Sequence, residues 1–177
     1  MSTGATTVSD PHVETLRSLA AALGEDHFTT TTFRDNLRIH VAADRLIPAL
    51  RALKDSAGFA SLAELGAVDY LKYPGRSGPR FEVHYCLLNM ERRERVVVKV
   101  GVDDPDPALP SVVDLWLGAN WMEREVFDLF GIRFDGHPDL RRILMPDEFT
   151  AFPLRKDYPL RGRGERHNFP RLTRAES

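Results

Sequence analysis

The sequence has 177 residues, of which 42% are hydrophobic and 28% charged, and its formal net charge is −2. This length and composition suit one domain with a modest extension and a real hydrophobic core. No apolar run approaches the roughly 20 residues that a membrane-spanning helix needs, so we expect a soluble or at most peripheral protein. The single cysteine, Cys86, excludes an internal disulfide and a cysteine-ligated iron-sulfur cluster within this chain.

The two ends of the chain differ in charge. Residues 1–9 have neither a basic start nor an apolar stretch, which predicts a disordered N-terminus without a targeting peptide and a cytoplasmic protein. Residues 1–140 hold 15 basic and 21 acidic side chains, whereas 141–177 hold 9 and 5. The basic C-terminal part lacks the interleaved aromatic residues that stack on bases, so we expect a protein partner and no nucleic acid.

The first structured part of the chain is predicted to be a helix followed by a hairpin. Asp10 and Pro11 are suited to open the helix, and Gly24 is suited to close it. A threonine-rich strand at 27–34 leads through a short polar turn into a strand at 37–41, where apolar and polar residues alternate.

A second helix and three strands follow. Asp44 is predicted to cap the helix, which ends before Gly58. A long, less regular strand is expected at 62–73, and two strands with strict alternation at 81–87 and 95–102. The helix positions expected to face inward are Leu46, Leu50, Leu53 and Ala57. We therefore predict an α+β fold, a mostly antiparallel sheet of about five strands with helices packed on one side.

An internal boundary is predicted where three Asp and three Pro interrupt the pattern, at 103–110. Residues 10–102 then form the α+β domain. The region 111–146 holds a further helix and an irregular turn, with Ser111 as a helix cap. Residues 147–177 form an extended C-terminal arm.

The most informative stretch of the sequence begins with the helix after Asn120. Asn120 is a good N-cap, and Gly131 can supply the left-handed residue that ends the helix. An apolar stripe at helical spacing predicts one buried face, formed by Ala119, Met122, Val126 and Leu129.

The other faces of this helix are densely charged. Arg124 and Asp128 are spaced for an i,i+4 ion pair, worth only about 0.3–0.5 kcal/mol if exposed. A solvated helix face with one ordinary ion pair is therefore one interpretation. After the helix, however, His137 and Pro138 predict a rigid turn, and Asp139 can cap a further short turn. The segment is too irregular to be explained by the packing of a single helix.

Carboxylates and imidazole in this stretch raise the possibility of a metal site. Glu123, Glu125, Asp128 and His137 are suitable ligand types, but the Glu-x-x-His pairs of helical di-iron sites are missing. The sequence also lacks a glycine-rich phosphate loop and a G-x-S-x-G nucleophile motif. We therefore expect no metal, no cofactor and no catalytic residue in this chain.

The same stretch resembles the signature of the C-type subunit, the 30 kDa subunit family, of the proton-translocating NADH:quinone oxidoreductase, respiratory complex I. The resemblance covers approximately residues 43–160 and lapses beyond Leu160, where members commonly have an acidic, tyrosine-containing tail. The motifs that carry it, at matching spacing, are Glu123-Arg124-Glu125, Asp128-Leu129-Phe130, His137, Arg141, Ile143-Leu144 and the run from Pro153 to Leu160.

This resemblance implies a structural subunit of the peripheral arm that has no redox centre of its own. It would hold the quinone-site subunit (D type) against iron-sulfur subunits (B, I and G types), in an enzyme that transfers electrons from NADH to quinone and translocates protons. Iron-sulfur clusters, FMN, NADH and quinone would all bind to partner subunits. The chain would lie at the cytoplasmic face of the bacterial inner membrane and contact the membrane only through the complex.

The resemblance also implies interface or structural roles for the signature residues. Ion pairs of the helix would stabilise a boundary between proteins, and the segment 152–160 would be ordered by a neighbouring subunit. The residues concerned are Glu123, Arg124, Glu125, Asp128, Phe130, His137, Pro138, Arg141, Arg142, Leu144, Arg155, Lys156 and Asp157.

Two alternatives remain open at the level of sequence. Related subunits occur in membrane-bound nickel-iron hydrogenases and in F420H2- or ferredoxin-linked relatives of complex I. A hypothesis of another class is a free-standing adaptor that uses the basic tail.

Overall fold

A computed structural model describes residues 12–34 and 36–165. Its helices are α1 (Val13–Leu23), α2 (Leu46–Asp55) and α3 (Ala119–Phe130), with short 3-10 turns η1 (Glu25–His27) and η2 (Ala43–Arg45). Its strands are β1 (Phe28–Phe33), β2 (Asn36–Val41), β3 (Ser61–Asp69), β4 (Phe81–Asn89), β5 (Glu94–Val102), β6 (Ala108–Pro110) and β7 (Arg133–Asp135). The predicted disorder of residues 1–9 lies outside the described residues.

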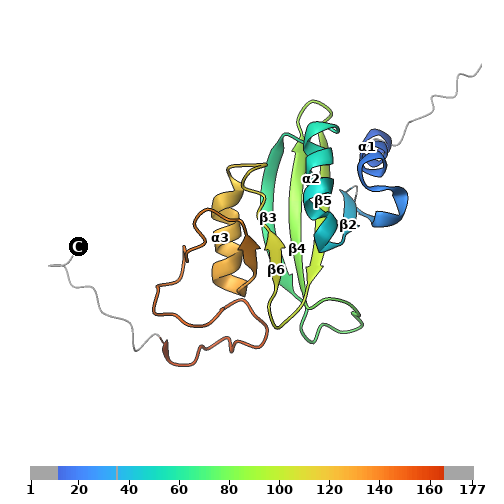
Figure 1. The fold of residues 1–177 in the computed structure, drawn as a ribbon. Helices are drawn as coiled ribbons and strands as arrows, with labels where there is room; N and C mark the ends of the chain where they lie inside the picture. Colours follow the sequence, from blue (N-terminus) through green and yellow to red (C-terminus); the bar gives the residue numbers. More distant parts are fainter. Residues whose placement is uncertain (1–11, 35, 166–177) are drawn as a thin grey trace, which may run out of the picture.

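Five strands form one sheet in the order β1-β2-β5-β4-β3. Neighbouring strands are antiparallel except for β2 and β5, which are parallel. Helices α1 and α2 pack together, and Figure 1 shows α2 lying over the middle of the sheet while α3 lies beside β3. The predicted α+β fold with a mostly antiparallel five-stranded sheet is confirmed.

Alternation in the strands produces the core. Phe81, Val83, Tyr85 and Leu87 of β4 are all fully buried, and the facing valines of β5 are buried as well. Full burial of such a side chain stabilises the fold by about 1.5–3 kcal/mol. The helix positions predicted to face inward are likewise buried, namely Leu46, Leu50, Leu53 and Ala57.

Several predicted element ends are wrong for local reasons. Asp44 does not cap α2, because the chain first forms the turn η2 and the N-cap is Arg45, without a side-chain hydrogen bond. The third strand ends at Asp69, whose carboxylate accepts the Leu71 N–H at 2.8 Å and so stabilises a turn before Tyr73. Gly24 ends α1 as predicted, whereas its predicted start at Asp10 and Pro11 lies outside the described residues.

The C-terminal half packs onto the free side of β3. The strands β6 and β7 pair in parallel and lie on either side of α3 in the sequence, and α3 packs along β3. The N-cap of α3 is Gly118, so Asn120 lies inside the helix and the predicted cap is wrong. Gly131 does adopt the predicted left-handed conformation (φ 72°, ψ 24°). A side chain there would also collide with the ring of Phe152, which lies 2.5 Å from an ideal Cβ position.

Residues 147–164 contain no helix or strand and follow a series of bends and turns past α3 and below the sheet (Figure 1). Within the described residues, no helix combines the length and the apolar character needed to cross a membrane.

Candidate functional site

Among the signature residues, Asp128 is held by several hydrogen bonds at once. Its side chain is fully buried, and Oδ2 accepts the consecutive backbone N–H groups of Ile143, Leu144 and Met145 at 3.0, 2.7 and 2.8 Å. Burial alone would raise the pKa of this carboxyl, but these hydrogen bonds and that from Arg142 outweigh it and lower the pKa below its usual range. Asp128 is therefore an ionised carboxylate that fixes the loop after His137 against α3.

Arg142 is the ion-pair partner of Asp128. Its Nη1 donates to Asp128 Oδ1 at 2.6 Å, and Nη2 donates to the Ala151 carbonyl at 3.1 Å. The guanidinium also lies 5.3 Å from the ring centroid of Phe152. The predicted i,i+4 pair between Arg124 and Asp128 is therefore wrong, because a cation distant in the sequence approaches the carboxylate from the loop side.

Arg124 instead stabilises the backbone of the same loop. Its Nε and Nη2 donate to the carbonyls of Arg141 and Arg142, both at 3.0 Å. The side chain of Arg141 is 75% exposed and forms two hydrogen bonds of 2.7 Å with Asp139. Arg141 and Arg142 thus both bind carboxylates of this chain, and Arg142 also binds a carbonyl.

Glu123 is the second buried carboxyl of α3. It accepts hydrogen bonds from the Ser111 hydroxyl and the Val112 N–H, both at 2.7 Å, and its side chain is fully buried. Burial outweighs these two hydrogen bonds and raises the pKa of Glu123 to about 7. The prediction that Ser111 caps a helix is therefore wrong, because α3 begins only at Ala119 and the Ser111 side chain binds Glu123 of that helix instead.

His137 and Tyr85 complete the surroundings of Glu123. His137 Nδ1 accepts the Asp139 N–H at 3.0 Å, which leaves Nε2 to donate to the Asn120 carbonyl at 3.1 Å. That Nε2 lies 4.0 Å from Glu123 Oε2. The buried hydroxyl of Tyr85 has no hydrogen-bond partner within the described residues, and burial followed by the charge of Glu123 raises its pKa. His137 thus orders the turn beside Pro138, as its position in the sequence suggests.

A second cluster, which the sequence did not reveal, joins the C-terminal segment to the sheet. Asp69 is fully buried, and Arg80 binds it through two hydrogen bonds of 3.1 and 2.8 Å. The Lys156 N–H also donates to Asp69 at 2.8 Å, and Asp157 lies 3.0 Å from Arg80. Arg155 Nε donates to the carbonyl of Phe130 at 2.6 Å. Residues 155–157 therefore have partners within this chain, and the ordering of 152–160 by a neighbouring subunit stays a prediction.

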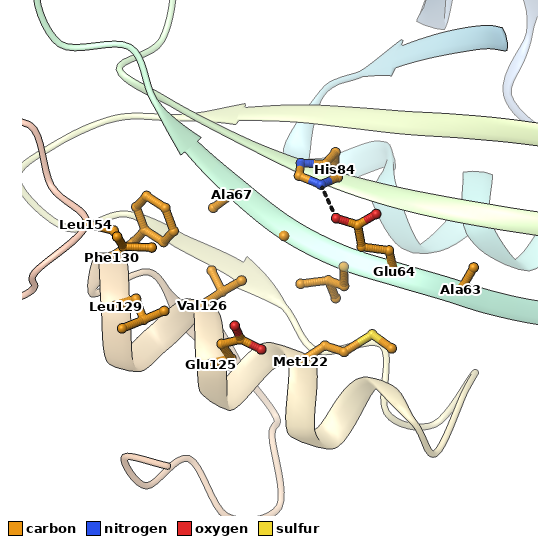
Figure 2. A pocket seen from close by; sticks show the side chains of 12 residues that line it. Ala63, Glu64, Ala67, His84, Met122, Glu125, Val126, Leu129, Phe130 and Leu154 are labelled. Carbon is orange, nitrogen blue, oxygen red and sulfur yellow. Dashed lines mark hydrogen bonds and ion pairs between the residues drawn. The ribbon is translucent and has the colours of Figure 1, made fainter. Parts of the chain in front are cut away.

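The signature residues thus divide between two clusters and the surface. Glu123, Asp128 and His137 are buried beside α3, whereas the predicted trio at 155–157 binds around Asp69. Glu125 belongs to neither cluster, because it is exposed and lines a groove between α3 and β3 (Figure 2). Leu144 contributes its N–H to Asp128, but its side chain is 60% exposed. Across residues 12–34 and 36–165, no group of three or more acidic, histidine or cysteine side chains is placed to hold a metal ion.

Side chains beside α3 leave apolar surface exposed. Leu117, Trp121 and Leu144 are 85%, 67% and 60% exposed, and the guanidinium of Arg124 lies 5.9 Å from the ring centroid of Trp121. Large apolar side chains exposed side by side with arginine are typical of surfaces that bind other proteins.

Comparison with known proteins identifies which subunit this is. Residues 39–164 match the family model described as respiratory-chain NADH dehydrogenase, 30 Kd subunit. The chain belongs to this family, and bacterial relatives that it resembles are C subunits of NADH-quinone oxidoreductase. It is 47% identical over 147 residues to the C-type subunit of Roseiflexus sp. (strain RS-1), with 82% of each chain covered. It is 45% identical to that of Geobacter sulfurreducens, covering 73% of this chain and 78% of the relative.

Two solved structures share the fold. A chain described as Nqo5 of the trypsin-resistant fragment (1-134) is 37% identical, with a TM-score of 0.65, and covers 72% of this chain and all of that one. A chain of the archaeal membrane-bound sulfane sulfur reductase, a respiratory membrane complex, is 25% identical with a TM-score of 0.72. That match covers 93% of this chain and 95% of the other.

Proposed function

We propose that this subunit has a structural, non-catalytic role in the peripheral arm of complex I. It holds the quinone-site subunit (D type) against the iron-sulfur subunits (B, I and G types) at the cytoplasmic face of the bacterial inner membrane. Iron-sulfur clusters, FMN, NADH and quinone bind to those partners. The chain supports electron transfer from NADH to quinone, and the coupled proton translocation, by holding the other subunits in fixed positions relative to one another.

The observation that carries this proposal is the exposed apolar surface around α3. Trp121 and Leu144 are large apolar side chains, and their exposure to water does not stabilise an isolated chain. Arg124 connects them, because it lies beside the Trp121 ring and donates to the carbonyls of the loop that leads to Leu144. Aromatic and arginine side chains are also enriched in the cores of protein interfaces.

A second candidate keeps the fold and changes the complex. The observation behind it is the likeness to a chain of the archaeal sulfane sulfur reductase, a respiratory membrane complex, and the candidate is the equivalent subunit of a membrane-bound nickel-iron hydrogenase or of an F420H2- or ferredoxin-linked relative. Identity to the NADH-quinone oxidoreductase subunits is nearly twice as high, at 47% against 25%, which favours the NADH enzyme.

The experiment is affinity purification of the tagged full chain from mildly solubilised native membranes. Partners are identified by mass spectrometry, and NADH:quinone activity is measured on the eluate. Co-purification of iron-sulfur and flavin subunits with activity is the expected result. Recovery of hydrogenase subunits would select the second candidate, and a lone monomer would overturn both and favour a free-standing adaptor.

Arg124→Ala tests the structural role. Loss of hydrogen bonds from a charged donor costs about 1.5–3 kcal/mol, so the loop at 141–144 should loosen and the yield of assembled complex should fall. Activity per assembled complex should stay at the wild-type level. Arg51→Ala, at an exposed position of α2, is the matched control and should assemble normally. A variant that assembled fully yet lost quinone reduction would contradict the role.

A further inference from the structure

Arginines gather at one end of the sheet, in and beside two turns. The turn between β1 and β2 and the turn between β4 and β5 lie at the same end, because β2 and β5 are parallel and pair from Leu37 and Val96 onwards. Figure 1 shows the second of these turns at the top of the sheet. Each turn contains an exposed arginine, Arg34 in the first and Arg93 in the second.

The backbone at these two arginines favours other residue types. Arg34 and Arg93 have positive φ angles of 46° and 54°. This left-handed conformation is adopted readily by glycine and more often by asparagine or aspartate than by arginine. Strained positions of this kind cluster at functional sites. A role for the two exposed side chains in binding would account for arginine at both turns.

A groove of about 410 Å³ lies between Asn36, at the start of β2, and the turn after β4. Its volume is within the usual range of binding sites. Leu88 and Met90 supply apolar surface, and the Met90 side chain is 75% exposed. Arg93 and Arg95 line the same groove, and neither forms a hydrogen bond or an ion pair with another residue of the described ranges. The groove therefore combines apolar surface with guanidinium groups whose donors are free.

Positive charge at this end is only partly balanced within the chain. Positions 34–38 and 90–95 hold five arginines and three acids. Glu94 reaches the groove, but it is buried and bound at 3.0 Å to the one arginine of its turn that points toward α1. Glu91 is exposed and does not line the groove, and Asp35 lies outside the described residues. The surface therefore complements a partner with negative charge.

The kind of negative partner follows from the other side chains. None of the described residues that line the groove is aromatic, so the groove offers no ring on which a nucleotide base could stack. Beside the groove, the half-exposed ring of Phe33 has the guanidinium groups of Arg34 and Arg38 at 5.3 and 4.5 Å from its centroid. Arginine combined with exposed apolar side chains is typical of protein interfaces, and its planar fork matches a carboxylate.

We propose that this end of the sheet binds an acidic segment of a neighbouring subunit. Carboxylates of the segment bind Arg93 and Arg95. An apolar side chain beside them packs on Leu88 and Met90. This inference rests on the proposed function, since the segment belongs to a partner in the complex. It adds a contact surface separate from that of Trp121, because no residue of α3 lines this groove.

The test is photo-crosslinking in native membranes, where the full chain is part of its complex. The photoreactive residue p-benzoylphenylalanine is placed at Met90 of the tagged chain. In a separate sample it is placed at Trp121, on the surface that carries the proposed function. Crosslinked subunits and their crosslinked peptides are identified by mass spectrometry.

The crosslink from position 90 is then measured in two variants and a control. Arg93→Glu/Arg95→Glu reverses the charge of the groove. Arg93→Gly removes one guanidinium and relieves the strain of a positive φ, so a loss of folding does not explain its effect. The control, Arg17→Glu/Arg51→Glu, makes the same change of charge at exposed positions of α1 and α2.

We expect position 90 to crosslink to a segment of another subunit that contains aspartate or glutamate. The charge reversal should lower the crosslink yield by about tenfold and Arg93→Gly by a smaller factor, whereas the control should leave it unchanged. The inference is overturned if position 90 crosslinks only to lipid or nucleic acid or to nothing, if the crosslinked segment has no acid, or if the charge reversal changes the yield no more than the control.

The sample labelled at position 121 separates this inference from the proposed function. If position 121 crosslinks to a partner subunit and position 90 does not, only this inference falls. A lone monomer without crosslinks from either position would remove the proposed function as well.

Discussion

Two carboxyls of α3, Glu123 and Asp128, are both shielded from solvent and differ in ionisation. Asp128 accepts three backbone N–H groups and a guanidinium, which keep its pKa below the usual range. Glu123 accepts one N–H and one hydroxyl, so burial dominates and raises its pKa to about 7. Glu123 also lies deeper in the protein than Asp128, so its carboxyl is more strongly desolvated as well as having fewer donors, and both differences raise its pKa relative to that of Asp128. One end of this helix therefore has a fixed charge, whereas the other titrates near neutral pH.

The largest effect should come from Asp128→Asn. An amide has one acceptor oxygen, so it cannot satisfy both the N–H groups of residues 143–145 and the guanidinium of Arg142, whose side chain is only 14% exposed. Breaking one side of a buried pair costs about 3–5 kcal/mol. Denaturant unfolding of the full chain measures the loss, with the exposed Asp114→Asn as control. A loss no greater than that of the control would mean that Asp128 is not the anchor of this loop.

Glu123→Gln should change how stability depends on pH. Between the ordinary pKa of 4.5 and about 7, the native state binds a proton at Glu123 that the unfolded chain releases. The free energy of unfolding of the wild type therefore falls as pH rises through this window, by up to about 3 kcal/mol. Glutamine imitates the protonated acid and can keep both hydrogen bonds, so the variant should lack this fall.

The measurement is unfolding of both proteins at a series of pH values from 4.5 to 7.5, with the pH dependence compared as a difference. The two proteins should be equally stable at the acid end and diverge toward neutral pH, with the variant more stable. Asp128 contributes with the opposite sign and at lower pH, because its lowered pKa makes its stabilisation disappear as pH falls. Parallel curves for the two proteins would show that Glu123 is already ionised at acid pH.

Local rules were sufficient for much of the fold. Alternation predicted β4 and β5, helical spacing predicted the buried side of α2, and Gly131 ended α3 because glycine tolerates a left-handed backbone. The predicted helix caps were wrong at two positions. Asp44 lies in a 3-10 turn that precedes the helix, and Asn120 lies inside the helix. These failures concern one or two hydrogen bonds and leave the topology unchanged.

The site was less predictable, because its contacts join residues distant in the sequence. The i,i+4 rule selects Arg124 as the partner of Asp128, but the turn through His137 brings Arg142 to that carboxylate instead. Asp69 and Arg80 carry no motif, and their role becomes visible only when the segment at 155–157 lies across them. Resemblance to the family singled out Asp128 and Glu123, whereas the partners of these side chains could be found only from the fold.

The smallest effect should come from Tyr85→Phe, which tests why the pKa of Glu123 is raised. The buried Tyr85 hydroxyl makes no hydrogen bond within the described part of the chain. Its removal should therefore leave stability unchanged or increase it by up to about 1 kcal/mol, since no partner is orphaned. The pH window of Glu123 should also stay where it is. If the hydroxyl does donate to Glu123, its loss removes a donor that favours the ionised form, and the window moves to higher pH. The same unfolding series on Tyr85→Phe separates these outcomes, and a shifted window would mean that Glu123 has three donors and resembles Asp128 more closely than its two hydrogen bonds indicate.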